Sequence, residues 1–254
     1  MGTIRTSPFV DDTVLLTLAK PPANAIDEHL LMDLHATLVS LNADNSVRGV
    51  VVTGSAGFFC AGFDFAAPRR DDDVALELYR HYRACNLELL MMPKPTIAWI
   101  NGHAIAGGFV LALACDLRIA VAGDYRIGMN EIAVGASFPR TAMEIVRLRL
   151  TDAQASELVL GADLIPANRA IHCGLAHEYV MRDAAESRVR EIARRVSSYP
   201  SGAYMHSKNA LIADAVDRIR AETDAEAIAT MAVWISDESR AARRRQRDRL
   251  NVGS

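Results

Sequence analysis

The sequence predicts an α/β protein in which strands and helices alternate over the first half and helices dominate the second. Short apolar runs of strand composition recur between residues 14 and 121, and each is bounded by glycine, proline or a polar residue. Between them, apolar residues recur at a spacing of three and four, which is typical of helices. Beyond residue 138 the patterns are helical, apart from one short strand near 177–180. This alternation favours a parallel or mixed sheet.

Four apolar runs in the first half are predicted strands, at residues 14–18, 49–54, 96–100 and 116–121. The second of these, Gly-Val-Val-Val-Thr-Gly, lacks polar alternation, so we expect a strand that is buried on both faces. Pro21 and Pro22 end the first run, and Pro93 and Pro95 stop the helix before the third.

Helix signals lie between and after these strands. Asp27 is a good N-cap, and five leucines follow it at helical spacing. The acidic residues 71–73 charge the positive end of a helix that reaches about Leu90. A helix that begins at Gly107 and ends at Ala114 is apolar all round, so it is buried. The remaining predicted helices span residues 138–150, 152–160, 166–172, 184–198, 202–214 and 223–240. No internal repeat is evident in the sequence.

Composition limits the classes of function. With 254 residues, 50% of them hydrophobic and 23% charged, the chain fits one core with an appendage, which we place at residues 1–195 and 196–254. A net charge of −3 gives no support to a nucleic-acid partner. The four cysteines show no metal-binding spacing, so we expect no metal and a reducing compartment. No apolar stretch reaches the ~18 residues of a membrane span, and no signal peptide is evident. We therefore predict a cytoplasmic protein without a membrane partner.

Two glycine-bearing segments carry the functional signal. Residues 58–65 read Phe-Phe-Cys-Ala-Gly-Phe-Asp-Phe and follow the doubly buried strand. Small residues there let the backbone approach a ligand, and an N–H group after a glycine turn can point outward. Residues 101–108 read Asn-Gly-His-Ala-Ile-Ala-Gly-Gly and lead into the buried helix. A glycine pair at a helix start presents N–H groups and the positive end of the helix dipole to a ligand oxygen.

Either segment alone is more often a site of close packing. Together and in this order they resemble the crotonase superfamily, also called the enoyl-CoA hydratase/isomerase family, in which FxAGxD and NGxAxGGG motifs supply the two halves of an oxyanion hole. The resemblance runs from about Asn24 to Tyr179. It implies a crotonase-like ββα spiral core, with a helical C-terminal region that makes trimer contacts. It also implies a homotrimer or a dimer of trimers, and an acyl-CoA thioester substrate with no further cofactor.

The resemblance assigns the oxyanion donors to the backbone N–H groups of Phe63 and Gly107. Such donors can each contribute ~3–4 kcal/mol to stabilising a developing enolate. Coenzyme A would lie along the loops at 24–26 and 61–65. The implied substrate contacts are Ala25, Ala61, Gly62, Phe63, Asp64, Gly107, Gly108 and Val110.

The acid–base residues depart from the pattern of the hydratases. Those enzymes place one glutamate three residues after the second oxyanion glycine, where this chain has Val110, whereas their second glutamate is retained as Glu131. Adding water needs carboxylates to orient the water and move protons, but shifting a double bond needs only one base. The pattern therefore looks like an isomerase of fatty acid metabolism that converts 3-enoyl-CoA to 2-enoyl-CoA. The apolar residues 132–134 predict a dry setting that raises the pKa of Glu131.

Two other functions stay open on the sequence: a hydratase that uses Glu131 alone, and a non-catalytic acyl-CoA-binding protein. Glu144 is either a substitute acid or an exposed helix carboxylate that pairs with Arg140 and Arg147. We interpret His103, inside the second glycine segment, as a packing residue rather than a base.

Overall fold

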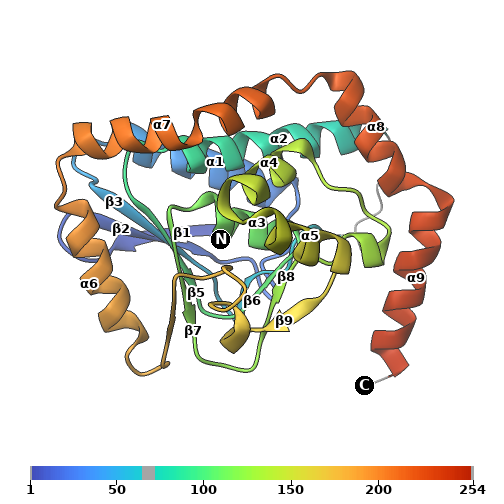
Figure 1. Cartoon of the computed structure of the whole chain (residues 1–254), viewed down its shortest axis with the longest axis horizontal. Helices are drawn as coiled ribbons and strands as arrows, with labels where there is room; N and C mark the ends of the chain where they lie inside the picture. Colours follow the sequence, from blue (N-terminus) through green and yellow to red (C-terminus); the bar gives the residue numbers. More distant parts are fainter. Residues whose placement is uncertain (1, 65–71, 253–254) are drawn as a thin grey trace.

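The computed structural model describes residues 2–64 and 72–252 and confirms the α/β class (Figure 1). A first sheet has six strands in the order β1-β2-β3-β5-β7-β10, and a second has four in the order β4-β6-β8-β9. β1 and β9, at one edge of each sheet, are antiparallel to their neighbours, and the other pairings are parallel. The first sheet contains β1 (Ile4–Pro8), β2 (Thr13–Leu18), β3 (Gly49–Thr53), β5 (Thr96–Ile100), β7 (Leu117–Val121) and β10 (Glu178–Val180). The second contains β4 (Phe58–Cys60), β6 (His103–Ile105), β8 (Arg126–Gly128) and β9 (Leu164–Pro166).

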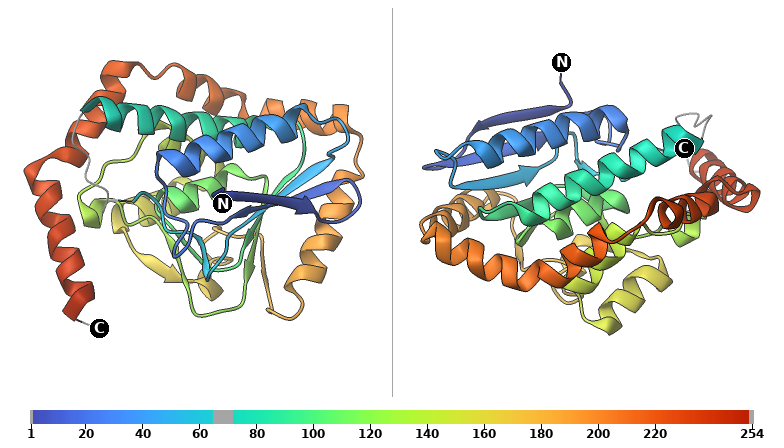
Figure 2. Two further views of the ribbon diagram at one scale, coloured as in Figure 1. Left: turned by 180° about the vertical axis from the view of Figure 1, so that it is seen from behind. Right: turned by 90° about the horizontal axis from the view of Figure 1, so that it is seen from above.

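The helices cover both sheets. α7 lies beside α2 and α4, and α8 and α9 run down one edge of the molecule (Figures 1 and 2). The helices are α1 (Glu28–Ala43), α2 (Asp72–Met91), α3 (Gly107–Ala114), α4 (Arg140–Arg149), α5 (Asp152–Gly161), α6 (Ala185–Ser197), α7 (Ser201–Arg220), α8 (Asp224–Ile235) and α9 (Asp237–Val252), with 3₁₀ turns η1 (Ile132–Val134) and η2 (Ala167–Arg169). α7, α8 and α9 pack on α2, α4 and η1 of the same chain. The predicted division of the chain at residue 195 stays a prediction.

A ββα unit repeats along the chain. β3-β4-α2, β5-β6-α3 and β7-β8-α4 each place one strand in the first sheet and the next in the second. Successive units pair in parallel in both sheets. The sequence shows no such repeat because the units share strand pairing and not side chains. This spiral is the fold that the family resemblance implies.

The first sheet is covered on both faces, as predicted from the apolar sequence of β3, in which polar and apolar residues do not alternate. Val50 and Val52 join the main core beneath the helices. Val51 points to the opposite face, where it packs with Val189 and Ile192 of α6. Since side chains alternate along a strand, a layer on each side leaves no position in β3 exposed.

Two of the predicted helices are wrong in part. Residues 166–172 form the end of β9, the turn η2 and further turns, because Leu164–Pro166 pairs with β8 instead of starting a helix. The helix predicted over 223–240 is divided at Ser236, which is extended at ψ 155. The Ser236 hydroxyl accepts a hydrogen bond from the backbone N–H of Ser239 at 3.2 Å and so caps α9. Strands β1, β4, β6, β8 and β9 were not predicted.

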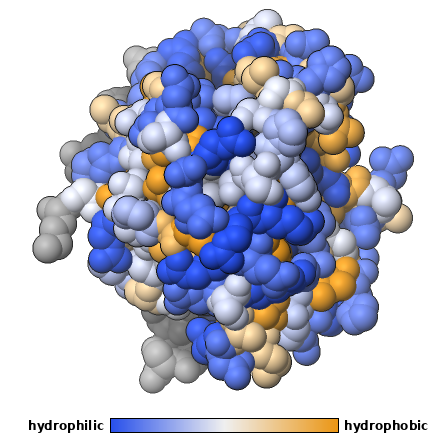
Figure 3. All heavy atoms as spheres, turned by 90° about the vertical axis from the view of Figure 1, so that its left-hand side faces the viewer, coloured by the Kyte–Doolittle hydropathy of each residue, from blue (hydrophilic) through white to orange (hydrophobic). Residues whose placement is uncertain are grey.

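No helix within residues 2–64 and 72–252 is long and apolar enough to cross a bilayer. On the face shown in Figure 3, hydrophilic residues cover most of the surface and apolar residues form small separate areas.

Candidate active site

Three predicted site residues follow the carboxyl ends of three adjacent parallel strands in the second sheet. Phe63 comes just after β4, Gly107 just after β6, and Glu131 just after β8. β4 pairs with β6, and β6 pairs with β8, both in parallel. The carboxyl ends of parallel strands lie at the same end of a sheet, which is where α/β proteins bind their ligands. The fold therefore brings the three residues together at this end of the second sheet.

The two glycine segments are in direct contact. Gly62 has a φ of +80, which favours glycine. A Cβ atom on Gly62 would lie 2.8 Å from the carbonyl oxygen of Ile105 and 3.3 Å from the nitrogen of Gly107. A Cβ atom on Gly107 would lie 3.1 Å from Cε2 of Phe63. This approach requires glycine at position 62 and places residues 63 and 107 side by side.

The backbone around Gly107 suits a hydrogen-bond donor. Gly107 is the first residue of α3, so its N–H has no acceptor within the helix and lies at the positive end of the helix dipole. Ala106, just before it, has φ 54 and ψ −134, a conformation that costs about 1–3 kcal/mol for a residue with a side chain. The N–H of Ala106 donates to the carbonyl of Gly128 at 2.8 Å and helps to hold this turn.

Phe63 lies in a short extended segment beside residue 26. The N–H of Ile26 donates to the carbonyl of Gly62 at 2.8 Å, and the N–H of Asp64 donates to the carbonyl of Ile26 at 2.9 Å. Because backbone groups alternate in direction along an extended chain, the N–H of Phe63 points away from Ile26.

The loops expected to contact coenzyme A also lie together. The N–H of Ala61 donates to the carbonyl of Ala23 at 3.1 Å, and the amide of Asn24 donates to the carbonyl of Phe58 at 2.9 Å. The ammonium of Lys20 donates to the carbonyl of Ala25 at 2.8 Å. Predicted contact residues 25, 61 and 64 therefore share one pair of loops, while residue 65 lies outside the described residues.

Glu131 is a buried carboxylate. It is 5% exposed, and its Oε2 has no hydrogen-bond partner among the described residues. Burial raises the pKa of Glu131 to about 8. The dry setting was expected from the apolar residues 132–134, of which Val134 is buried, whereas Ile132 and Ala133 are exposed.

The remaining contact candidates belong to α3. Val110 is fully buried one turn into the helix, so no acid stands at this position. A Cβ atom on Gly108 would lie 2.4 Å from the carbonyl oxygen of Cys60. Because Gly108 has no side chain, α3 packs closely against the end of β4.

The surroundings of Glu144 match neither of the two alternatives, a substitute acid or an exposed helix carboxylate. It is buried rather than exposed, with one oxygen 3.0 Å from Nη1 of Arg147 and the other 2.6 Å from Nε of Arg218. Arg140 pairs with Glu226 of α8 instead. The contact with Arg147 matches the helix pairing that the sequence predicts, and Arg218 supplies a second partner from α7.

His103 packs, as predicted. Its ring stacks on Phe58 at 4.8 Å, and its Nδ1 accepts a hydrogen bond from the N–H of Arg126 at 3.2 Å. Burial lowers the pKa of His103, which favours the neutral ring.

Two aromatic residues at the site have no signal in the sequence. Tyr82 of α2 and Trp234 of α8 both contact Phe63, with ring centroids 4.8 and 5.0 Å away. Each lies on the buried side of a helix far from Phe63 in the chain, so it looks like an ordinary core residue.

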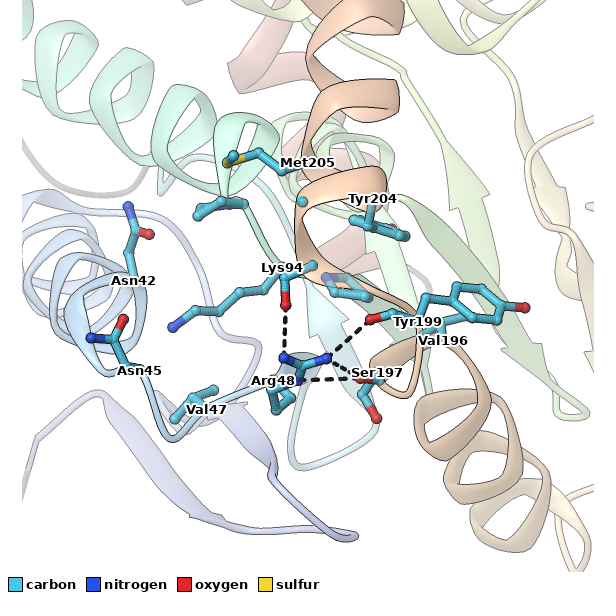
Figure 4. Close-up of a pocket in the computed structure, with 14 residues that line it drawn as sticks. Asn42, Asn45, Val47, Arg48, Lys94, Val196, Ser197, Tyr199, Tyr204 and Met205 are labelled. Carbon is cyan, nitrogen blue, oxygen red and sulfur yellow. Dashed lines mark hydrogen bonds between the residues drawn. The ribbon is translucent and has the colours of Figure 1, made fainter.

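A cavity of about 210 Å³ between α1, α6 and α7 is a separate structural junction (Figure 4). Lys94 donates to the carbonyls of Leu41 and Asp44 at the end of α1, at 2.5 and 2.6 Å. Arg48 donates to the carbonyl of Tyr199 at 3.0 Å and to Oγ of Ser201 at 2.7 Å. These cations satisfy backbone groups where helices end or begin.

A second cavity, of about 450 Å³, is lined in part by Asp116. Oδ2 of Asp116 accepts hydrogen bonds from Nζ of Lys208, the hydroxyl of Tyr204 and the N–H of Thr96, each at 2.9 Å. Neither cavity includes residues 63, 107 or 131. In the part of the chain that the structure describes, no group of three or more His, Cys, Asp or Glu residues stands together as metal ligands would.

The architecture has close counterparts among solved structures. A human mitochondrial delta3-delta2-enoyl-CoA isomerase superposes with a TM-score of 0.92 over 99% of both chains, at 23% identity, which establishes the class as the crotonase fold. The family model for enoyl-CoA hydratase/isomerase matches residues 11–246. The chain belongs to the enoyl-CoA hydratase/isomerase family, so it is an enzyme, a hydratase or an isomerase, that acts on acyl-CoA.

Both hydratases and isomerases are among the proteins that are similar to this chain. A probable enoyl-CoA hydratase of Bacillus subtilis is 32% identical over 164 residues, which are 63% of each protein, so the match spans less than two thirds of that relative. Enoyl-CoA delta isomerase 1 of Mus musculus mitochondria is 28% identical over 229 residues, 89% of this chain and 78% of that one. These similarities leave the choice between hydration and isomerisation to the site.

Proposed function

We propose that this enzyme moves the double bond of 3-enoyl-CoA to position 2, with Glu131 as the sole base. The observation that carries the proposal is the buried carboxyl group of Glu131, whose Oε2 has no hydrogen-bond partner among the described residues, at the end of the sheet where Phe63 and Gly107 also lie. Val110 occupies the position of the hydratases' other glutamate. Glu144 has an arginine on each oxygen, so it does not serve as a replacement acid.

The reaction needs one proton carrier and one anion site. The Glu131 carboxylate takes a proton from C2 of the substrate, and the electron pair of that C–H bond delocalises through C3=C4 and the thioester to give a dienolate. The N–H groups of Phe63 and Gly107 donate to the thioester oxygen as its negative charge grows. The Glu131 carboxyl then returns the proton to C4, which leaves the double bond between C2 and C3 and restores the base.

A hydratase that uses Glu131 alone is the second candidate. Because its pKa is raised to about 8, Glu131 is largely protonated near neutral pH and is able to give a proton to C2 of 2-enoyl-CoA. Hydration would still need a second group to orient and deprotonate the water.

Product analysis separates the two. The protein is incubated separately with 3-enoyl-CoA and 2-enoyl-CoA, and products are followed by liquid chromatography and mass spectrometry. We expect 2-enoyl-CoA from the 3-enoyl substrate without a change in mass. Faster formation of a hydrated product from 2-enoyl-CoA would refute the isomerase proposal.

The assembly and compartment are proposals too. We propose a homotrimer or a dimer of trimers, as the family resemblance implies, and a cytoplasmic location, as the scattered cysteines favour. Light scattering coupled to size-exclusion chromatography measures the assembly, and a monomer would contradict it.

A further inference from the structure

One side chain touches both halves of the proposed oxyanion hole. Tyr82 of α2 is 1% exposed, and its hydroxyl donates to the carbonyl oxygen of Gly107 at 3.2 Å. Its ring lies 4.8 Å from that of Phe63, centroid to centroid, at an angle of 53°. A Cβ atom on Gly107 would lie 3.4 Å from the tyrosine oxygen. Tyr82 therefore contacts the two residues whose N–H groups are the proposed donors.

We propose that Tyr82 is a positioning residue for the oxyanion hole, with its ring supporting Phe63 and its hydroxyl holding Gly107. This inference rests on the oxyanion hole of the proposed function and goes beyond it, since Tyr82 lies outside both glycine segments. Tyr82 does not donate to the substrate. It acts through the backbone of the two donor residues.

The backbone at Gly107 explains why such a contact matters. The donor N–H belongs to the peptide that joins Ala106 to Gly107, and the carbonyl bound by Tyr82 belongs to the next peptide. Holding that carbonyl resists rotation of residue 107 and so keeps its N–H in one direction. Ala106 is in an unfavourable conformation, which persists only where neighbouring contacts hold it.

The charge environment keeps the hydroxyl a donor. Burial raises the pKa of Tyr82 well above its usual value near 10, and an ionised Glu131 raises it further. The phenol therefore keeps its proton at neutral pH.

A matched control distinguishes positioning from ordinary packing. Tyr125 is 3% exposed, and its hydroxyl donates to the carbonyl of Ile100 at 3.0 Å. Tyr125→Phe thus removes the same kind of buried hydrogen bond, but at a place that contacts none of the proposed donors. Losing such a bond costs about 1 kcal/mol of stability at either site, so both variants should fold.

The experiment compares Tyr82→Phe and Tyr125→Phe with the parent protein. Steady-state kinetics give kcat and KM, and ¹³C NMR of bound [1-¹³C]butanoyl-CoA reports how strongly the donors polarise the thioester carbonyl. For Tyr82→Phe we expect kcat to fall about 10-fold, less than the loss of a whole donor, with KM within about 3-fold. The carbonyl resonance should move toward its position in free ligand, and the pH profile should keep its inflection. Tyr125→Phe should leave kcat and the resonance unchanged.

Two results would overturn the inference. One is a Tyr82→Phe variant with the parent's kcat and carbonyl resonance. The other is a fall in kcat with the parent's resonance, which would place the effect of Tyr82 on the base. The NMR measurement needs no turnover, so it tests Tyr82 even if the enzyme proves to be a hydratase. A parent protein that does not displace the resonance on binding would refute the oxyanion hole itself.

Discussion

The turn that carries Glu131 and the helix that carries Glu144 bury a glutamate to nearly the same degree, 5% and 4% exposed, in opposite surroundings. Glu144 has an arginine on each oxygen, and both arginines reach solvent. Oε2 of Glu131 has no hydrogen-bond partner in the described part of the chain, and burial raises its pKa. Burial alone therefore does not mark a reactive carboxylate. The missing partner does, because an unpaired buried charge costs stability that packing alone does not recover.

The largest expected difference is in activity. Glu131→Gln keeps the shape of the side chain but removes the base, so we expect isomerisation to fall by at least ~100-fold while acyl-CoA still binds. Glu144→Gln should keep activity within about 3-fold, because it changes a structural ion pair. Steady-state rates with 3-enoyl-CoA measure both. If the two variants lost activity equally, the contrast between the glutamates would have no catalytic meaning.

The same two variants should change stability in opposite directions. The pKa of Glu131 is about 8 in the folded protein against 4.5 ordinarily, so the folded state holds a proton that the unfolded chain has released between these values. The parent protein therefore loses stability as pH rises from about 4.5 to 8. We expect Glu131→Gln to raise the free energy of unfolding at pH 9 by about 2–4 kcal/mol, with little change at pH 4.

Glu144→Gln should instead lower the free energy of unfolding by about 1–2 kcal/mol, because it removes the charge that pairs with Arg147 and Arg218. The loss is small because both arginines are partly exposed and water screens these ion pairs. Urea unfolding at the two pH values measures both variants. A Glu131→Gln variant less stable than the parent at pH 9 would show that the carboxylate has a partner.

The pH dependence should follow Glu131 alone. A base with a pKa of about 8 goes from mostly protonated at pH 7 to mostly ionised at pH 9. Isomerisation kcat/KM should therefore rise about 10-fold over this interval. Rates measured in constant-ionic-strength buffers provide the test, with a flat profile over pH 6–9 as the contrary result.

The smallest expected effect is a gain. Val110→Glu adds the carboxylate that the hydratases carry, and two nearby carboxylates separate their pKa values into one acid and one base. We expect a few-fold gain in hydration of 2-enoyl-CoA, with a loss of several kcal/mol of stability from a glutamate in an apolar wall. The variant is first checked for folding and for binding of a CoA ligand. A parent protein that already hydrates at the rate of ordinary hydratases would remove the argument from Val110.

Local signals account for the parts of the fold that sequence reasoning predicted. Asp27 caps α1 by accepting from the N–H of Leu30 at 2.9 Å, and the five leucines at helical spacing are all buried. β4, β6 and β8 are three residues each, too short to show a period. Their pairing is nevertheless what brings the site together, so that convergence was accessible only through the family resemblance.

Partners far along the chain explain what sequence reasoning missed at the site. Glu144 and Arg218 are 74 positions apart, and nothing near either residue indicates the pair. Tyr82 and Trp234 reach Phe63 from two different helices. Such contacts depend on how helices pack, which local pattern does not encode.

The placement of the site residues on successive ββα units divides recognition from chemistry. On our proposal, the first two units hold the thioester with backbone groups, and the third supplies the one reacting side chain. Backbone donors survive most substitutions so long as the turn keeps its shape. A substitution in the loop after β8, or at position 110 in α3, is then able to change what happens to a bound thioester, while the backbone groups that hold the thioester stay in place.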